Sequence, residues 1–124
     1  WHKGIIGLGF HYRNIIEYIL MHSKGTSTRK ITKSPNFYME DKPKHLDHPT
    51  PKPTGLYRWL IRNSTLPGET VLDCFAGSGT VGVAALREER NFLGCDIDEK
   101  FVKYSNERIN KERNQGKLFD TTTR

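Results

Sequence analysis

Apolar and polar positions follow two different periods in the second half of the chain. Residues 69–73 form a short apolar and β-branched run that ends at a cluster of glycines, and residues 79–89 continue as an apolar stretch of helical length. Residues 91–95 repeat the strand pattern. Residues 98–111 have the period of a helix, with Asp98 as its N-cap and one face formed by Phe101, Ser105, Arg108 and Ile109. Strand, helix, strand and helix within about 45 residues predict a βαβ unit with parallel strands.

The first half of the chain is less regular. Leu56, Trp59 and Leu60 form the apolar stripe of a short helix over residues 53–63, with a proline in its first turn. Residues 15–21 are an apolar run of strand length. Residues 1–14 and 23–50 mix glycine, proline, charged and hydroxyl residues and predict loops, the second of them partly disordered. The residues after 114 are polar, and we expect a frayed tail.

The composition limits the class of protein. With 124 residues and an apolar fraction of 35%, the chain is one domain or part of one. It has no apolar run long enough to span a membrane and no basic-then-apolar start typical of a signal peptide, so we expect a cytoplasmic protein. Cys74 and Cys95 lack metal-ligand spacing, and we expect two small buried side chains, with a redox pair as the alternative.

The net charge of +6 is unevenly distributed. Residues 53–99 carry a net charge of −3, and the segments 24–52 and 100–124 carry +4 each. This division suits a small cationic ligand at the centre of the domain and a polyanion at its edges. Charges that serve solubility, together with a solvated C-terminal helix, would give the same pattern.

The glycines after the first expected strand predict a ligand-binding loop. Gly77, Gly79 and Gly82 satisfy the G-x-G-x-x-G pattern of nicotinamide and flavin proteins, in which a pyrophosphate lies over the turn. Asp73 disfavours that ligand, because two like charges about 4 Å apart repel by about 4 kcal/mol at an effective dielectric of 20. S-adenosylmethionine carries an ammonium and a sulfonium and no phosphate, so Asp73 would attract it. The alternative for Asp73 is a buried carboxylate that braces the loop.

A second acidic residue, Asp96, ends the second expected strand. Its place predicts hydrogen bonds to both ribose hydroxyls of a nucleoside, for either class of ligand, and Ile97 could pack on the adenine ring. The alternative for Asp96 is the N-cap of the following helix.

Three short blocks stand in a recognisable order along the chain: HPTPKP at residues 48–53, DCFAGSGT at 73–80 and GCDID at 94–98. Together they resemble the DNA methyltransferases that modify the amino group of adenine (N6) or cytosine (N4), in the circularly permuted class whose cofactor half comes last. The stretches around Trp1, Tyr12, Glu17 and Ser23 are similar to the segment before those blocks, so the resemblance spans residues 1–112. It implies an α/β, Rossmann-like, S-adenosylmethionine-dependent methyltransferase fold that is incomplete, with parallel strands and crossover helices.

The resemblance also implies roles for single residues. In that family the glycine loop holds S-adenosylmethionine, the acid after the second strand binds its ribose, and the HPTPKP block lines its methionine end. Taken alone, His48 could equally be a surface or capping residue, and Lys52 could meet the cofactor carboxylate, a DNA phosphate or only water. Together with the acid and the isoleucine discussed above, the candidate cofactor-binding residues are His48, Thr50, Lys52, Asp73, Phe75, Ala76, Gly77, Ser78, Gly79, Thr80, Asp96 and Ile97.

We therefore divide the chain into three parts: a partial sheet segment with a basic loop (1–52), an S-adenosylmethionine-binding βαβα unit (53–112) and a polar tail (113–124). The partner that the family implies is DNA, and charge alone leaves RNA open. In the basic loop the candidates for phosphate contacts are Lys24, Arg29, Lys30, Lys33 and Lys44, with a solvated loop as the alternative.

The family's catalytic motif, an Asp, Asn or Ser followed by Pro-Pro and an aromatic residue, does not occur in these 124 residues. In the family it holds the target amine and stacks on the flipped base. SPNF at residues 34–37 is the nearest match, but Asn36 replaces the second proline and the block follows the segment it should precede. We assign no catalytic residue and expect the motif upstream or in a second subunit. The chain would then be a fragment, a split subunit or a decayed gene product.

Three functions follow from these observations. The first is the cofactor-binding portion of a site-specific DNA methyltransferase that acts on adenine N6 or cytosine N4 once a catalytic half completes it. The second is a non-catalytic cofactor-sensing or partner-binding module of the same fold. The third is a fragment of a nicotinamide-dependent oxidoreductase, which Asp73 disfavours. We expect the isolated chain to bind S-adenosylmethionine weakly or not at all, because a half-sheet leaves an open edge and an incomplete pocket.

Overall fold

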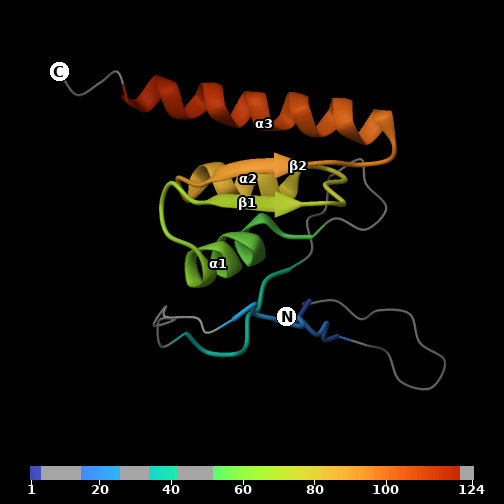
Figure 1. Cartoon of the computed structure of the whole chain (residues 1–124), viewed down its shortest axis with the longest axis vertical. Helices are drawn as coiled ribbons and strands as arrows, with labels where there is room; N and C mark the ends of the chain where they lie inside the picture. Colours follow the sequence, from blue (N-terminus) through green and yellow to red (C-terminus); the bar gives the residue numbers. More distant parts are fainter. Residues whose placement is uncertain (4–14, 26–33, 42–51, 121–124) are drawn as a thin grey trace.

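The computed structural model describes residues 1–3, 15–25, 34–41 and 52–120, of which 116–120 are described by their backbone only. Five elements follow one another in the order α1, β1, α2, β2 and α3 (Figure 1). Their bounds are Thr54–Ser64 for α1, Thr70–Asp73 for β1, Thr80–Arg87 for α2, Asn91–Gly94 for β2 and Glu99–Asp120 for α3. All five expected elements of this part of the chain are therefore present, with ends that differ by a few residues.

The two strands pair in parallel, and the register runs from Thr70 opposite Asn91 to Asp73 opposite Gly94. The helix α2 connects them and covers one face of the sheet. On that face Val71 and Phe92 pack against a core that includes Ala84 and Ala85, both fully buried. This arrangement confirms the predicted α/β class with parallel strands joined by a crossover helix.

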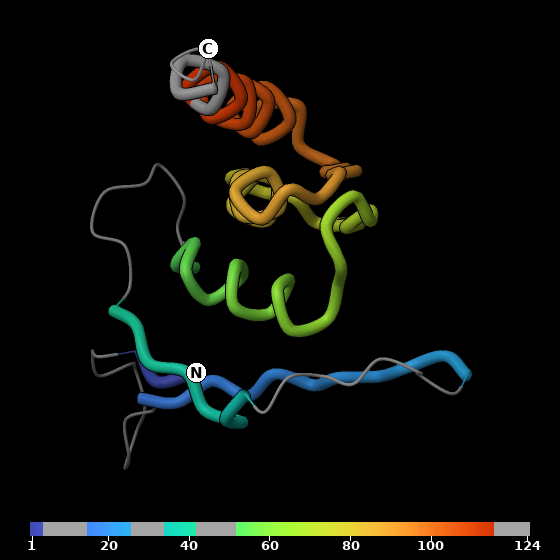
Figure 2. Tube along the Cα trace, turned by 90° about the vertical axis from the view of Figure 1, so that its left-hand side faces the viewer, coloured from blue at the N-terminus to red at the C-terminus, as the bar shows by residue number. Residues whose placement is uncertain are grey.

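The helices are stacked in the order α3, α2 and α1, and the N-terminal segments lie beyond α1 (Figures 1 and 2). Ion pairs join the layers at the surface of the core. Glu88, directly after α2, accepts hydrogen bonds from Arg58 and Arg62 of α1, each with a shortest distance of 2.7 Å. On the other side, Arg87 of α2 donates to Glu112 of α3 at 2.7 and 2.8 Å. These ion pairs hold the C-terminal end of α2 between α1 and α3.

The second face of the sheet, turned to the viewer in Figure 1, carries no helix among the described residues. Leu72 and Leu93 lie on it and are 61% and 62% exposed. Cys74 and Cys95 directly follow the last residues of β1 and β2 and are exposed as well, with the Cys95 thiol 3.5 Å from the Cys74 carbonyl oxygen. The prediction that both cysteines are buried is wrong, because the alternation of the strands, continued by one residue, assigns them to the uncovered face.

The expected strand over residues 15–21 is not present. The described part of the N-terminal region forms only single bridges, from His2 to Ile16 and to Met39. Tyr18 and Leu20 are 90% and 84% exposed, so no described layer covers this apolar run. The segment 34–41 contacts α1 through Tyr38, whose ring centre lies 5.4 Å from that of Trp59.

The last helix extends beyond its expected end. Residues 115–120 were expected to belong to a frayed tail, yet α3 continues to Asp120. This stretch lacks proline and contains several good helix formers, and Glu112 is anchored by Arg87. Among the described residues, no helix combines the length and apolar character that a membrane crossing requires.

Candidate functional site

The loop between β1 and α2 is built by glycine conformations. Gly77 has a φ of +48° and Gly79 a φ of +73°, a region that side chains other than glycine rarely adopt. The Gly79 N–H donates to the Ala76 carbonyl at 2.8 Å, which closes the turn, and α2 begins at the next residue. Both glycines therefore serve the loop as the sequence pattern predicts.

The third glycine of the pattern has a different purpose. A Cβ atom at Gly82 would lie 2.5 Å from Cδ1 of Ile109 and 2.9 Å from the Phe92 ring. Gly82 thus allows α2 to approach β2 and α3 closely, and it lies in the helix rather than over the turn. Of the three glycines in the G-x-G-x-x-G pattern, two therefore shape the loop, and the third allows close packing of α2.

Asp96 braces the loop from the neighbouring strand end. Its Oδ2 accepts a hydrogen bond from the Gly77 N–H at 2.8 Å, and its Oδ1 accepts one from the Asp98 N–H at 3.0 Å. The N-cap of α3 is Asp98, whose Oδ1 accepts from the Lys100 N–H at 2.9 Å. The capping alternative for Asp96 is therefore wrong, and its carboxylate is held at the glycine turn.

Asp73 lies at the end of β1 and lines a cavity. Its Oδ1 accepts a hydrogen bond from the Phe75 N–H at 3.0 Å, so it also braces the loop. The carboxylate is only half-buried, in contrast to the fully buried alternative. Across the cavity, burial and then the Asp73 charge raise the pKa of Tyr57, which keeps its phenol protonated at neutral pH.

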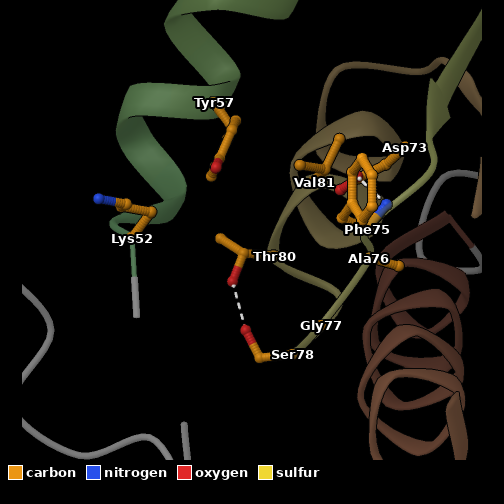
Figure 3. A pocket seen from close by; sticks show the side chains of 9 residues that line it. All are labelled: Lys52, Tyr57, Asp73, Phe75, Ala76, Gly77, Ser78, Thr80 and Val81. Atoms are coloured by element: carbon orange, nitrogen blue, oxygen red, sulfur yellow. Dashed lines mark hydrogen bonds between the residues drawn. The ribbon is translucent and has the colours of Figure 1, made fainter. Parts of the chain in front are cut away.

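Two cavities flank the loop. The first, of about 170 Å³, opens between the loop and the start of α1 (Figure 3). The second, of about 320 Å³, lies between β2 and α3 and includes Asp96, Phe92 and Leu93. Ala76 borders both. The residues that line the first cavity are Lys52, Tyr57, Asp73, Phe75, Ala76, Gly77, Ser78, Thr80 and Val81.

Lys52 reaches the first cavity from the residues before α1 and is held there by Glu17. The lysine Nζ donates to Glu17, and the Lys3 Nζ lies 3.5 Å from the same carboxylate. The Lys52 ammonium also lies 5.3 Å from the centre of the Trp1 ring. Two lysines thus share one carboxylate, and of the two Lys52 lines the cavity.

The structure brings most of the sequence candidates together, with differing exposure. Phe75 is 89% exposed, and Ile97 has its whole side chain exposed. Ser78 and Thr80 are buried, and their hydroxyl oxygens lie 3.0 Å apart. Lys24 is exposed. His48, Thr50, Arg29, Lys30, Lys33 and Lys44 lie outside the described residues.

Sequence reasoning missed two residues of this site. Tyr57 was not singled out, although it stands one position after Leu56 of the predicted stripe. Arg108 was placed on one face of the last helix but not connected to the loop, which its guanidinium contacts at the Ser78 carbonyl, 2.9 Å away.

No group of three or more His, Cys, Asp or Glu residues in the described part of the chain is arranged to hold a metal ion.

Comparisons with known proteins agree with this geometry. The family model described as "DNA methylase" matches residues 5–107. The type II methyltransferase M1.MboII of Moraxella bovis is 46% identical over 66 residues, which cover 53% of this chain and 25% of that protein. The type II methyltransferase M.BglI of Bacillus subtilis is 44% identical over 73 residues, or 59% of this chain and 21% of that one. The chain thus spans about a quarter or less of these relatives.

A solved structure extends the likeness to three dimensions. The crystal structure of the M1.HpyAVI–SAM complex superposes with a TM-score of 0.54 at 32% sequence identity. The match covers 62% of this chain and 42% of that one. The predicted Rossmann-like fold is confirmed by this match, in a small and partial form.

Proposed function

This chain belongs to the DNA methylase family, and we propose that it forms the S-adenosylmethionine-binding portion of a DNA methyltransferase. Two of the blocks that resemble the family in sequence, at residues 73–80 and 94–98, lie in one place in the fold, at the carboxyl ends of β1 and β2. This is the edge at which parallel α/β sheets bind their ligands.

The observation that carries the proposal is the division of charge around the glycine loop. The cavity on one side is lined by Asp73 and Lys52, which suits an amino-acid group with an ammonium and a carboxylate. On the other side Asp96 lines the second cavity, where its carboxylate would accept from ribose hydroxyls. S-adenosylmethionine has these groups at its two ends, whereas the pyrophosphate of a dinucleotide would lie over the turn between two carboxylates.

The individual roles follow from that placement. Residues 73–80 would hold the cofactor with Asp73 at its ammonium, and Lys52 with His48 and Thr50 would line its methionine end. Asp96 would bind its ribose, and Ile97 would pack on its adenine. With these roles we keep the proposed division of the chain into residues 1–52, 53–112 and 113–124. Phosphate contacts to DNA would come from the basic loop, through Lys24 and its neighbours at 29, 30, 33 and 44.

Methyl transfer would need residues that this sequence does not contain. The 124 residues include no Pro-Pro-aromatic motif that could receive an adenine or cytosine amine. We propose that a catalytic half, in a longer chain or a second subunit, supplies it. The same absence supports the second candidate, a cofactor-binding module without catalysis.

Titration with S-adenosylhomocysteine and, separately, with NAD tests the assignment of the ligand. We expect S-adenosylhomocysteine at millimolar concentration to shift the amide resonances of Gly77 and Gly79, with a dissociation constant above the micromolar range, because the pocket is incomplete. NAD should have no effect. Asp73→Asn should weaken the response, while Asp98→Asn, which keeps a capping side chain on α3, should not. An equal response to NAD, or a response to NAD alone, would contradict the proposal.

Label transfer separates the two candidate functions. The chain alone, given S-adenosylmethionine with a tritiated methyl group and unmethylated DNA, should transfer no label. Transfer should begin when a half carrying the Pro-Pro-aromatic motif is added. Transfer by the chain alone would refute the need for that half, and a complete absence of transfer with it would favour the non-catalytic module.

A further inference from the structure

The helix α3 supports the glycine loop from the side opposite the first cavity. A Cβ atom at Gly79 would lie 2.8 Å from Cβ and 3.1 Å from Cα of Ser105, so the loop rests directly on the α3 backbone. Ser105 is buried, and its hydroxyl donates to the Val102 carbonyl of its own helix. The contact at Ser105 is therefore one of packing, and it sets the distance between loop and helix.

One turn further along α3, Arg108 adds directed hydrogen bonds to the same loop. Its Nη1 donates to the Ser78 carbonyl at 2.9 Å and to Thr80 Oγ1 at 3.0 Å, and it lies 3.5 Å from Ser78 Oγ. The side chain is half-buried, and this burial lowers the pKa of the guanidinium. Arginine nevertheless remains protonated in proteins. Charge-assisted hydrogen bonds in such surroundings are stronger than those between neutral groups.

These bonds leave one hydroxyl proton of the Ser78–Thr80 pair free to donate. A guanidinium has only donors, so the Thr80 oxygen must accept from Arg108. Ser78 and Thr80 are 3.0 Å apart, and one hydroxyl donates to the other. Whichever is the donor, the pair has used one of its two protons. The second proton is available to an acceptor in the cavity that both residues line (Figure 3).

We propose that Arg108 is a positioning residue of the cofactor site, which fixes the Ser78–Thr80 turn and makes its hydroxyl pair a donor toward the carboxylate of the ligand. The positive charge of the Arg108 guanidinium behind the hydroxyls favours an anionic acceptor over a cationic one. Asp73 would then pair with the ammonium group of the same ligand. The inference rests on the proposed function, and it extends that function to a helix outside the three sequence blocks.

The test compares Arg108→Gln with Lys111→Gln, which removes an exposed charge from the same helix. Two ligands are titrated: S-adenosylhomocysteine, which has the carboxylate, and 5′-methylthioadenosine, which lacks the amino-acid group. Arg108→Gln should weaken S-adenosylhomocysteine binding about tenfold and leave 5′-methylthioadenosine binding unchanged. Arg108→Lys, which keeps the positive charge, should restore part of the preference for S-adenosylhomocysteine over 5′-methylthioadenosine. An equal loss for both ligands, or a loss as large in Lys111→Gln, would overturn the positioning role.

A measurement without ligand keeps this test separate from the proposed function. The Gly79 amide, which donates to the Ala76 carbonyl, should exchange its hydrogen several times faster in Arg108→Gln than in the unmodified chain or in Lys111→Gln. Faster exchange would support the loop contact even in a chain that binds neither ligand, so this result does not depend on the cofactor assignment. Unchanged exchange at Gly79 would reject the role of Arg108 whatever the chain binds.

Discussion

The two faces of the β1–β2 sheet differ in what covers them. On one face Val71 and Phe92 pack against α2 around the fully buried Ala84 and Ala85. On the other face Leu72 and Leu93 are more than 60% exposed, and two exposed cysteines follow them. The same four-residue strands therefore have one face in a protein core and one in water.

This difference bears on the completeness of the fold. Parallel sheets are normally covered on both faces, and their strands are apolar on both sides for that reason. The strands here have apolar residues on both faces, although only one face is covered among the described residues. The M1.HpyAVI chain is matched over 42% of its length. We therefore expect the proposed catalytic half to pack on the face of Leu72 and Leu93.

Substitutions of two adjacent residues of β2 should give the largest difference in stability between the two faces. Phe92→Ala removes a ring that packs on the core, and we expect the free energy of unfolding to fall by about 3 kcal/mol. Leu93→Ala, on the exposed face, should change it by less than about 0.5 kcal/mol. Urea denaturation followed by circular dichroism measures both. Equal losses would mean that the second face is also covered in the isolated chain.

Loss of the ion pairs at the edge of the covered face should lower the free energy of unfolding by a smaller amount. The hydrogen bonds from Arg62, and then from Arg58, lower the pKa of Glu88, whose side chain is 8% exposed. A lowered pKa stabilises the fold above about pH 4.3, and this contribution disappears as the pH falls through the folded-state value.

Glu88→Gln should therefore reduce the free energy of unfolding by about 1–2 kcal/mol at pH 7, and the difference from the unmodified chain should vanish in acid. Glu89→Gln provides the control, because Glu89 is the exposed neighbour. Denaturation curves at several pH values measure the effect. If both variants lose the same stability, or if the Glu88→Gln loss persists below pH 3, the ion pairs are not its cause.

The sequence predicted the elements of the covered face well and the contacts between distant elements poorly. The strands and α2 could be predicted because their period is local and Gly77 and Gly79 mark the turn. The contact of Arg108 with Ser78 could not be predicted, since it joins residues thirty positions apart whose approach depends on the packing of α3.

The errors have a common physical reason. Cysteine is usually buried, and the prediction for Cys74 and Cys95 rested on this tendency alone. The apolar run at 15–21 was expected to be a strand because of its length, yet a strand needs a continuous partner and the described residues offer only single bridges. In both places local composition is typical of a larger sheet than the described residues form.

The smallest change in stability, and the most direct view of the uncovered face, should come from the cysteines. Cys74→Ser and Cys95→Ser should leave the Tm unchanged, and each remaining thiol should react with a water-soluble thiol reagent in the folded chain. Partial desolvation, and then the neighbouring Cys74 thiol, raise the pKa of Cys95, so Cys95 should react more slowly at pH 7.5 than the thiol of free cysteine. A catalytic half that packs on Leu72 and Leu93 should protect both thiols. Thiols that react only after denaturation would show that this face is already covered, and thiols that stay reactive in an active complex would place the half elsewhere.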